Sequence, residues 1–218
     1  MHEVWTYFTV HHSEIMGWLW TTVWLAGVPL VVGLLLALPI GWVASRYHWT
    51  YPPITSIAGL LYTIPSLVLF LVIPGILGTG ILSPLNVAVA LTGYTIALLV
   101  RTVADGLDSV SSDTMSAAAA MGYTGRQRLV AVQLPLAVPV IGAGLRVAAV
   151  SNVSLVSVAS VIGVLQLGQL FVVGYDYNAL APTFLGLVLF VLLALAFDLV
   201  ILGIVRVLTP WQRAVGRP

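Results

Sequence analysis

The sequence predicts an all-α integral membrane protein that forms one transmembrane domain over residues 1–218. Hydrophobic residues make up 60% of the chain and charged residues only 7%, whereas soluble domains average about 25% charged residues. Several apolar runs reach the length of about 20 residues that a helix needs to cross a bilayer. Within lipid such runs must be helical, because every backbone group needs an internal partner. The runs are continuous, unlike the short alternating segments of a β-barrel.

We expect about five transmembrane helices. Their predicted ranges, in chain order, are Trp18–Ala44, Ile54–Ile73, Leu85–Val103, Leu134–Val158 and Ala181–Leu208. Tryptophans mark both ends of the first span, with Trp18, Trp20 and Trp24 at one end and Trp42 and Trp49 at the other. Such aromatic belts are typical of the two membrane–water interfaces. Outside the spans, the glycine-punctuated residues 163–176 predict a short re-entrant or surface helix.

The arginines indicate the orientation of the chain. If the N-terminus is outside, residues 1–17, 74–84 and 159–180 face outwards, and these segments contain no arginine. The arginines that then fall on or near the cytoplasmic face are Arg46, Arg101, Arg126, Arg128, Arg206, Arg213 and Arg217. The positive-inside rule therefore predicts an N-out/C-in topology.

The second predicted span contains a proline between polar residues, in Tyr62-Thr63-Ile64-Pro65-Ser66. A proline in this setting breaks the helix, and broken helices line the pathways of many transporters. Thr63 and Pro65 are therefore candidate residues of a translocation pathway. The prolines of the other spans are explained by ordinary kinks, which membrane helices tolerate.

Residues 104–133 form a long polar loop between the third and fourth predicted spans. Ser111-Ser112-Asp113 offer oxygen atoms that cap a helix N-terminus, and Met115–Met121 are good helix formers. Gly122 suits the left-handed conformation of a C-terminal cap. Pro135 is tolerated in the first turn of the fourth span, where its missing N–H would have no partner. We expect a short helix at the membrane surface, a turn and a second amphipathic stretch.

Four consecutive alanines, Ala117–Ala120, give the short helix a narrow face that a groove of another protein can grip closely. Because a short turn ties this helix to a spanning helix, it would move with such a partner. Periodicity alone leaves a plain interfacial helix without a partner as an equal alternative. The full pattern weighs against that alternative: Ala117-Ala118, then Met121-Gly122, then, after nine further residues, Val132-x-Leu134-Pro135.

This pattern resembles the cytoplasmic coupling loop of bacterial ABC-importer permeases, and within them the methionine-importer type with five core helices. Further stretches, between residues 15 and 175, resemble the osmoprotectant permeases for glycine betaine, carnitine or choline. In chain order they are Tyr62–Ser66, Met121–Gly122, Gln127–Leu129, Leu134–Ile141, Gly144–Arg146 and Val161–Gly163. The resemblance implies import of quaternary amines.

The resemblance also implies partners. A separate cytoplasmic ATPase, which binds the ATP and Mg, would contact the coupling loop. The matching loop residues are Ser116, Ala117, Ala118, Met121, Gly122, Val132, Leu134 and Pro135. A second permease subunit and an extracellular or periplasmic substrate-binding protein would complete the importer, in the lipids of the bacterial plasma membrane.

Two positions depart from the family pattern. Ser116 stands where the family has a Glu whose negative charge helps to bind the ATPase, and Gly163–Gly168 replaces a more glycine-rich stretch. A heterodimer, in which this chain pairs with a more typical permease, is one explanation of these departures.

Two charged side chains, Arg146 and Asp198, lie deep inside the fourth and fifth predicted spans. A lone charge at such a depth costs at least about 2.5–3.5 kcal/mol on insertion scales. We therefore expect the two residues to pair across the spans. The sequence leaves open a purely structural ion pair and a role in gating or in the pathway.

Small polar residues recur along the fourth span, with Ser151, Ser154, Ser157 and Ser160 at every third position and Asn152 beside them. Residues of this kind let helices pack closely and form hydrogen bonds across the interface. The alternative is a hydrophilic stripe along the translocation pathway, for which Ser151, Asn152, Ser154 and Ser157 are the candidates.

Other functions find little support. The chain has no cysteine, which excludes disulfides, thiolate metal sites and a cysteine nucleophile. We expect no metal site, no ATP bound by this chain in the absence of a P-loop, and no nucleic-acid partner at a net charge of +1. Aromatic cages for quaternary ammonium groups are expected on the separate binding protein.

Three alternative functions remain. The first is an importer of methionine or another small solute. The second is a self-contained secondary transporter, for which inverted halves are missing, and the third is a membrane-embedded enzyme, for which no catalytic constellation is seen.

Overall fold

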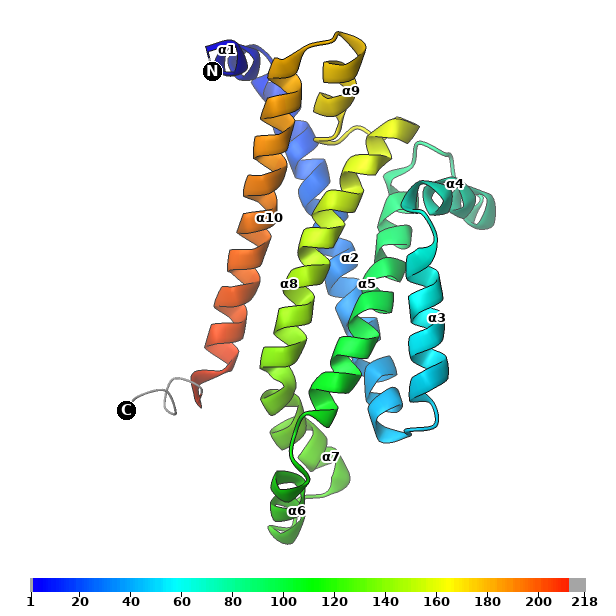
Figure 1. Ribbon diagram of the computed structural model, residues 1–218, viewed down its shortest axis with the longest axis vertical. Helices are drawn as coiled ribbons and strands as arrows, with labels where there is room; N and C mark the ends of the chain where they lie inside the picture. Colours follow the sequence, from blue (N-terminus) through cyan, green and yellow to red (C-terminus); the bar gives the residue numbers. More distant parts are fainter. Residues whose placement is uncertain (1, 212–218) are drawn as a thin grey trace.

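The computed structural model describes residues 2–211, and these residues form helices joined by short connections (Figure 1). The helices are α1 His2–Val10, α2 His12–Arg46, α3 Tyr51–Thr63, α4 Ser66–Leu77, α5 Pro84–Asp108, α6 Ser112–Ala120, α7 Gly125–Arg128, η1 Leu129–Gln133, α8 Leu134–Val158, η2 Ala159–Ile162, α9 Gln169–Asp176 and α10 Leu180–Leu208. Helix α1 and the end of α10 lie at opposite ends of the bundle. Arg213 and Arg217, used above for the orientation, lie outside the described residues.

Four helices, in the part of the chain that the structure describes, are long and apolar enough to cross a membrane. They are α2, α5, the continuous run 125–162 and α10, and the bent pair α3 and α4 makes a fifth if it counts as one span. The prediction of about five spans and an all-α fold is therefore confirmed. The predicted range of the fourth span coincides with α8, and the predicted starts and ends of the first, third and fifth lie within a few residues of α2, α5 and α10.

Helices α2, α5 and α8 form the centre of the bundle, with α10 against α8 and α3 against α5. The contact between α2 and α5 is close because two glycines of α2 face α5. A Cβ atom on Gly33 would lie 2.4 Å from Thr95 Cγ2, and one on Gly41 would lie 2.6 Å from Val103 Cγ1. Small residues that let two backbones approach in this way are typical of helix contacts in membranes.

Two glycines near the middle of the run 125–162 make α8 equally close to its neighbours. A Cβ atom on Gly142 would lie 2.4 Å from Val205 Cγ2 of α10. A Cβ atom on Gly144 would lie 2.4 Å from Thr102 Cγ2 of α5. Helix α8 is therefore held at this level from both sides.

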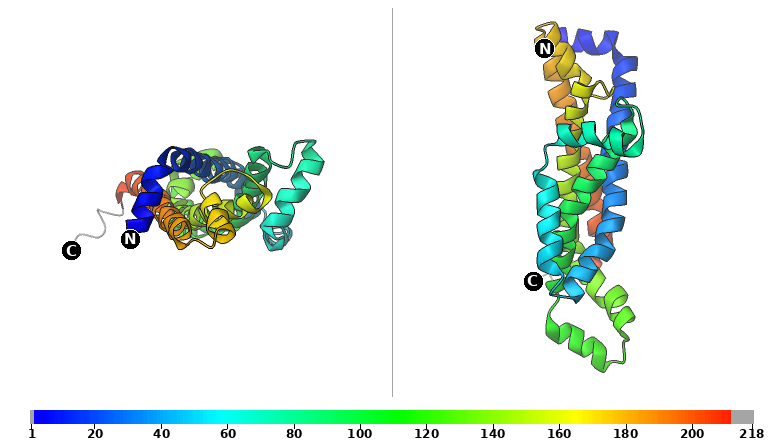
Figure 2. Two further views of the ribbon diagram at one scale, coloured as in Figure 1. Left: turned by 90° about the horizontal axis from the view of Figure 1, so that it is seen from above. Right: turned by 90° about the vertical axis from the view of Figure 1, so that its right-hand side faces the viewer.

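The second predicted span, Ile54–Ile73, is not one straight helix. It divides into α3 and α4, which meet at an angle of 100°. The break falls at Ile64–Pro65, where the sequence predicts it, and the hydroxyl of Tyr94 in α5 donates a hydrogen bond to the carbonyl of Ile64. Helix α4 consequently turns away from the direction of α3 and lies at the side of the bundle (Figure 2), where it contacts α5 and α8.

The connections at the two ends differ in form. At the N-terminal end, α1 runs across the bundle rather than along it (Figure 2). This helix was not predicted from the sequence. The short helix expected within residues 163–176 is α9, and it packs against α10. At the opposite end, α6 and α7 project beyond the other helices (Figure 1).

Candidate functional site

Helix α6 is capped at both ends by its own sequence. At its start, the hydroxyl of Ser111 accepts a hydrogen bond from the backbone N–H of Thr114 at 3.3 Å, as an N-cap residue does. At its end, Gly122 adopts φ +86°, in the left-handed region. The N–H of Gly122 donates to the carbonyl of Ala119 and that of Tyr123 to the carbonyl of Ala118. These two bonds make a Schellman motif, which turns the chain sharply.

Helix α7 begins immediately after this turn with a second cap. The backbone N–H of Thr124 donates to Gln127 Oε1 at 2.9 Å, and the N–H of Gln127 donates to Thr124 Oγ1 at 3.4 Å. This reciprocal pair is a capping box. Because one helix is closed and the next opened within three residues, Gly122–Thr124, the chain forms a defined corner between α6 and α7.

The corner continues without a loop into a spanning helix. Residues 125–162 form one helical run of 38 residues, in which Leu129–Gln133 are π-helical and the N–H of Leu134 donates to the carbonyl of Leu129. The next residue, Pro135, has no N–H to donate. The π-helical turn directly before it lets the helix continue through the proline without a break. The predicted amphipathic stretch and the fourth span are thus a single helix, and Pro135 lies inside it rather than at its beginning.

The corner exposes one part of the sequence pattern and buries another. In α6, Ser116, Ala117 and Ala119–Ala120 are exposed and Met121 is 70% exposed. Ala118 is only 1% exposed, and α6 packs against α7 and η1. The four alanines therefore do not form one free face, as the sequence analysis supposed.

The last residues of the sequence pattern attach the exposed corner to the helix bundle. Val132, Leu134 and Pro135 are half-buried in η1 and the start of α8. Gln133, between them, donates from Nε2 to the carbonyl of Leu107 at the end of α5, at 3.1 Å. The exposed corner is therefore fixed to the bundle through the half-buried residues. The predicted loop 104–133 is also shorter than expected, because α5 continues to Asp108.

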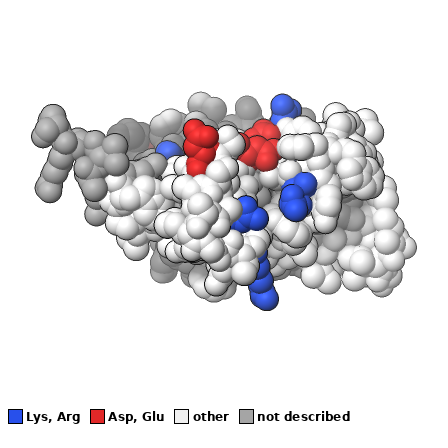
Figure 3. All heavy atoms as spheres, turned by 90° about the horizontal axis from the view of Figure 1, so that it is seen from below, with Lys and Arg blue, Asp and Glu red and all other residues white. Residues whose placement is uncertain are grey.

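A pocket of about 690 Å³ lies between this corner and the ends of α2 and α5. Three arginines line it, Arg46, Arg126 and Arg128, against one carboxylate, Asp108. The Asp108 carboxylate accepts a hydrogen bond from Ser45 Oγ at 2.5 Å. Within residues 2–211, the buried Nε of Arg128 has no hydrogen-bond partner. Figure 3, which views this end of the molecule, shows basic side chains spread over it. The pocket carries an excess of positive charge that suits an acidic partner surface.

Residues 29–214 match the family described as binding-protein-dependent transport system inner membrane component. The chain belongs to this family. Together with its apolar helices, this membership makes it a multi-pass protein of the inner membrane and a transport subunit.

Named relatives agree with this assignment. The osmoprotectant import permease protein OsmW of Salmonella typhimurium is 34% identical over 190 residues, which are 86% of this chain and 88% of OsmW. The choline transport system permease protein OpuBB of Bacillus subtilis is 27% identical over 212 residues, which are 96% of this chain and 95% of OpuBB. An inward-facing structure of the MetNI methionine ABC transporter aligns with a TM-score of 0.78 at 24% identity, covering 91% of this chain and 97% of the solved chain. That structure confirms the methionine-importer-like fold.

The permease brings together the two charged residues of its spans. Arg146 in α8 donates from Nε to Asp198 Oδ1 at 2.6 Å and from its second terminal nitrogen to Asp198 Oδ2 at 2.8 Å. The side chains are 39% and 22% exposed. They line an open pocket of about 440 Å³ together with Ser151. The paired charges therefore lie on the outer surface of the helix bundle, next to Ser151, the first of the serines that recur at every third position of α8.

For one candidate pathway residue, Asn152, the structure supports the packing interpretation. Asn152 is 1% exposed, and its Nδ2 donates to the carbonyl of Ala26 at 3.3 Å and to Thr95 Oγ1 at 2.9 Å. Its amide joins α8 to α2 and α5 inside the core. A side chain enclosed on all sides and already paired cannot line a pathway.

The other pathway candidates remain accessible. Ser154 is exposed and Ser151 and Ser157 are half-buried, whereas Ser160 is buried. The hydroxyl of Ser157 donates to the carbonyl of Ser154 at 2.7 Å, so it is satisfied within its own helix. Thr63 and Pro65 are exposed at the bend between α3 and α4. The serines lie on α8, which α4 contacts.

The basic pocket was not predicted from the sequence. Arg46 and Arg126 served only as signals of orientation, and Arg128 also as part of the stretch Gln127–Leu129 that carries the family resemblance. Arg46 lies about 80 residues before Arg126 and Arg128 in the sequence, and only the folding of the α6–α7 corner against the ends of α2 and α5 brings them to one place. Paired arginines two residues apart, directly after the corner, are a signal that could have pointed to it.

Proposed function

We propose that this chain is the permease subunit of an ATP-driven ABC importer and that helix α6, together with the corner Gly122–Thr124, couples it to a cytoplasmic ATPase. The observation that carries the proposal is the exposed, doubly capped corner that continues directly into a spanning helix. ATP and Mg belong to the ATPase subunit, and hydrolysis takes place there. The excess of arginines in the adjoining pocket supports an acidic contact surface on that partner.

Coupling follows from the continuity of the helix. When the ATPase closes on ATP, it pulls on α6, and the corner passes the movement to residues 125–162 without a flexible link. The spans then alternate between outward and inward access, and ATP and ligand shift an existing equilibrium between the two states.

The orientation is part of the proposal. The corner lies at the end that carries Arg46, Arg126 and Arg128, whereas Glu3, Glu14 and Asp176 lie in the arginine-free segments of the other end. The positive-inside rule places the arginine-rich end in the cytoplasm. The N-terminus is therefore outside.

We propose quaternary-amine osmoprotectants, namely glycine betaine, choline and carnitine, as the substrates. The names of the relatives OsmW and OpuBB support this class. The rival cargo is methionine or another small solute, because the solved MetNI structure shares the fold. A self-contained secondary transporter, the rival from another class, would need no ATPase.

A second permease subunit completes the pathway, and we favour a heterodimer. Ser116 offers no negative charge to the ATPase, so a partner permease with Glu at this position would supply the stronger contact. Blue-native electrophoresis with mass spectrometry of the purified importer should find two different permease chains. A homodimer of this chain alone contradicts the heterodimer and leaves the importer intact.

Uptake tests the function directly. Cells that lack the chain should lose uptake of labelled glycine betaine, choline or carnitine, and the wild-type chain should restore it. Gly122→Asp should not restore it, because the side chain strains the turn at φ +86° and adds a negative charge to the exposed corner that would face the acidic partner surface. Loss of methionine uptake alone would make methionine the substrate and would leave the assignment as an ABC importer unchanged. No loss of any substrate and no co-purifying ATPase would reject the importer.

A further inference from the structure

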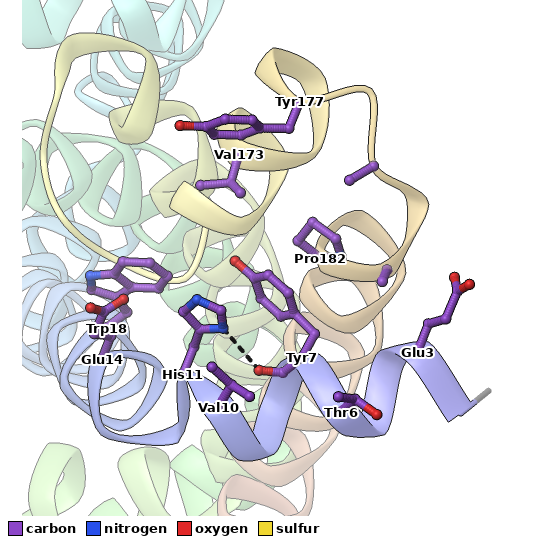
Figure 4. A pocket seen from close by; sticks show the side chains of 12 residues that line it. Glu3, Thr6, Tyr7, Val10, His11, Glu14, Trp18, Val173, Tyr177 and Pro182 are labelled. Carbon is purple, nitrogen blue, oxygen red and sulfur yellow. Dashed lines mark hydrogen bonds between the residues drawn. The ribbon is translucent and has the colours of Figure 1, made fainter.

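A second pocket, of about 780 Å³, opens at the N-terminal end of the bundle, between α1, the start of α2 and the turn from α9 to α10. Its volume lies in the range of small-molecule sites, about 300–1,000 Å³. Figure 4 shows Tyr7, His11 and Trp18 on one side of the pocket and Val173 and Tyr177 on the other, with Glu14 beside Trp18. Glu3 lies at its margin.

The local structure holds both walls in place. On one wall, the rings of Tyr7 and His11 stack with centroids 4.3 Å apart, and His11 Nδ1 lies 3.1 Å from the carbonyl of Tyr7. On the other, Gly174 packs so tightly that an added Cβ would lie 1.9 Å from Thr183 Oγ1 of α10. Asn178 then takes φ +49°, a conformation that Asn tolerates. This tight turn sets Tyr177 against the start of α10.

The chemistry of the walls suits an organic cation. Three aromatic rings, from Tyr7, Trp18 and Tyr177, can present faces to a cation, and Glu3 and Glu14 add two negative charges. None of the described lining residues is Lys or Arg. Burial, and next the negative charge of Glu14, raise the pKa of the Tyr7 hydroxyl above its usual value. Burial, the larger cause, disfavours any charge, and only the smaller contribution, the negative charge of Glu14, favours a cation here.

One opposing contribution is smaller. Ala181 and Pro182, in the first turn of α10, also line the pocket, and a helix N-terminus carries a partial positive charge of about +0.5. The two carboxylates carry full charges. The nearby Asp176 adds another, and residues 1–17 and 159–180 contain no arginine. The balance at this end of the molecule is negative.

We propose that this pocket binds a quaternary ammonium group on the permease itself, through Tyr7, Trp18, Tyr177 and Glu14. Methyl groups on nitrogen spread the charge over an apolar surface that matches aromatic rings and offers no hydrogen-bond donor. The inference rests on the proposed function and deepens it. The permease would hold such a substrate at its outer end, in addition to any site on the separate binding protein. The expectation that an aromatic cage exists only on the separate protein is then too narrow.

Direct binding tests the pocket. The assembled permease–ATPase complex, in nanodiscs of phosphatidylethanolamine and phosphatidylglycerol and without the binding protein, is titrated with labelled choline and with tetramethylammonium. We expect saturable binding of both. The uncharged carbon isostere of choline, in which carbon replaces nitrogen, should compete at least about 10-fold less well. If it competes equally, the pocket recognises only apolar bulk and the proposal is wrong.

Substitutions locate the site. Tyr177 is 79% exposed, so Tyr177→Leu should fold normally and weaken choline binding about 2- to 30-fold, the range of one cation–π contact. Tyr177→Phe, which keeps the ring, should bind within about 2-fold of wild type. Glu14→Gln should weaken binding of choline more than binding of the isostere.

A matched control comes from the adjoining helix α9. Tyr175 is 88% exposed and does not line the pocket, so Tyr175→Leu should leave binding unchanged. Equal loss in Tyr175→Leu and Tyr177→Leu, or none in Tyr177→Leu, overturns the proposal. Competition by phosphatidylcholine added to the nanodiscs would identify a lipid headgroup, rather than a free solute, as the source of the bound quaternary ammonium group.

The two proposals fail separately. If the importer carries quaternary amines but Tyr177→Leu binds and transports as wild type does, the pocket is wrong and the proposed function stands. If the wild type binds tetramethylammonium but no quaternary amine is imported, the proposed substrate class is wrong and the pocket stands.

Discussion

Gly122 is the residue on which the shape of the corner depends. Its φ of +86° costs a residue with a side chain about 1–2 kcal/mol, although an added Cβ would meet nothing within 4 Å. The strain would therefore act on the backbone alone. The corner would then populate other conformations, and α6 would no longer point in one direction.

We expect Gly122→Ala to lower the ATPase activity that the binding protein stimulates in the reconstituted importer by about 5- to 30-fold, with little loss of folded permease. The control is Gly125→Ala, three residues away, where an added Cβ is also free and the residue is already helical. That variant should stay within about 2-fold of wild type. Equal effects of the two substitutions would show that the corner does not depend on the left-handed residue.

At the scale of the helices, Arg146 and Asp198 connect α8 to α10 through two parallel hydrogen bonds. Asp198→Asn leaves the guanidinium of Arg146 without its carboxylate inside a span, so we expect a lower yield of folded protein and a lower melting temperature in detergent. Exchange of the two residues, by Arg146→Asp with Asp198→Arg, should restore the yield. A folded exchange variant that does not transport would assign a gating role to the pair.

The contact between α2 and α5 makes a second prediction at this scale. A Cβ on Gly41 would lie 2.6 Å from a Val103 methyl and 2.9 Å from the Val100 carbonyl oxygen. Gly41→Ala should therefore destabilise the permease by about 1–3 kcal/mol, as overpacking does, measured as a shift of the midpoint of unfolding. Gly59→Ala, with nothing near the added Cβ, should be neutral or stabilising. If Gly41→Ala does not change the stability, α2 and α5 can move apart at this position at little cost in free energy.

The helices and caps could be predicted because their signals are local. Ser111, Gly122 and Pro65 act within a few residues of themselves, and the predicted cap, turn and break are found at these places. The role of Asn152 could not be decided from the sequence because its partners lie on α2 and α5, and the sequence around a polar residue in a span does not show whether the residue faces a neighbouring helix or a pathway. Contacts between distant segments decide such cases.

At the scale of the whole molecule, the charges separate by end. The pockets of the two ends were not predicted because each joins segments far apart in the sequence, such as Glu14 and Tyr177 at one end and Arg46 and Arg128 at the other. The separation of charge itself was visible in the sequence, as the distribution of arginines. What it adds in three dimensions is two pockets of opposite charge at opposite ends of the bundle.

The topology can be tested because the natural chain has no cysteine. Tyr175→Cys and Met121→Cys place single thiols at positions that are 88% and 70% exposed, near opposite ends. In intact spheroplasts, a membrane-impermeant maleimide should label Tyr175→Cys and should label Met121→Cys only after permeabilisation. The reverse pattern would invert the proposed orientation and would place the arginine-rich pocket outside.

The glycines near the middle of the run 125–162 have a mechanical consequence. Gly142 and Gly144 clamp this helix against α10 and α5, with the α6 corner at one end of the run and the exposed serines near the other. We expect a helical run of about 57 Å, at 1.5 Å per residue, that is held near its midpoint to act as a two-armed lever. A push on the corner would then move the serine-bearing end in the opposite direction, so that narrowing at one face of the membrane would be tied to widening at the other.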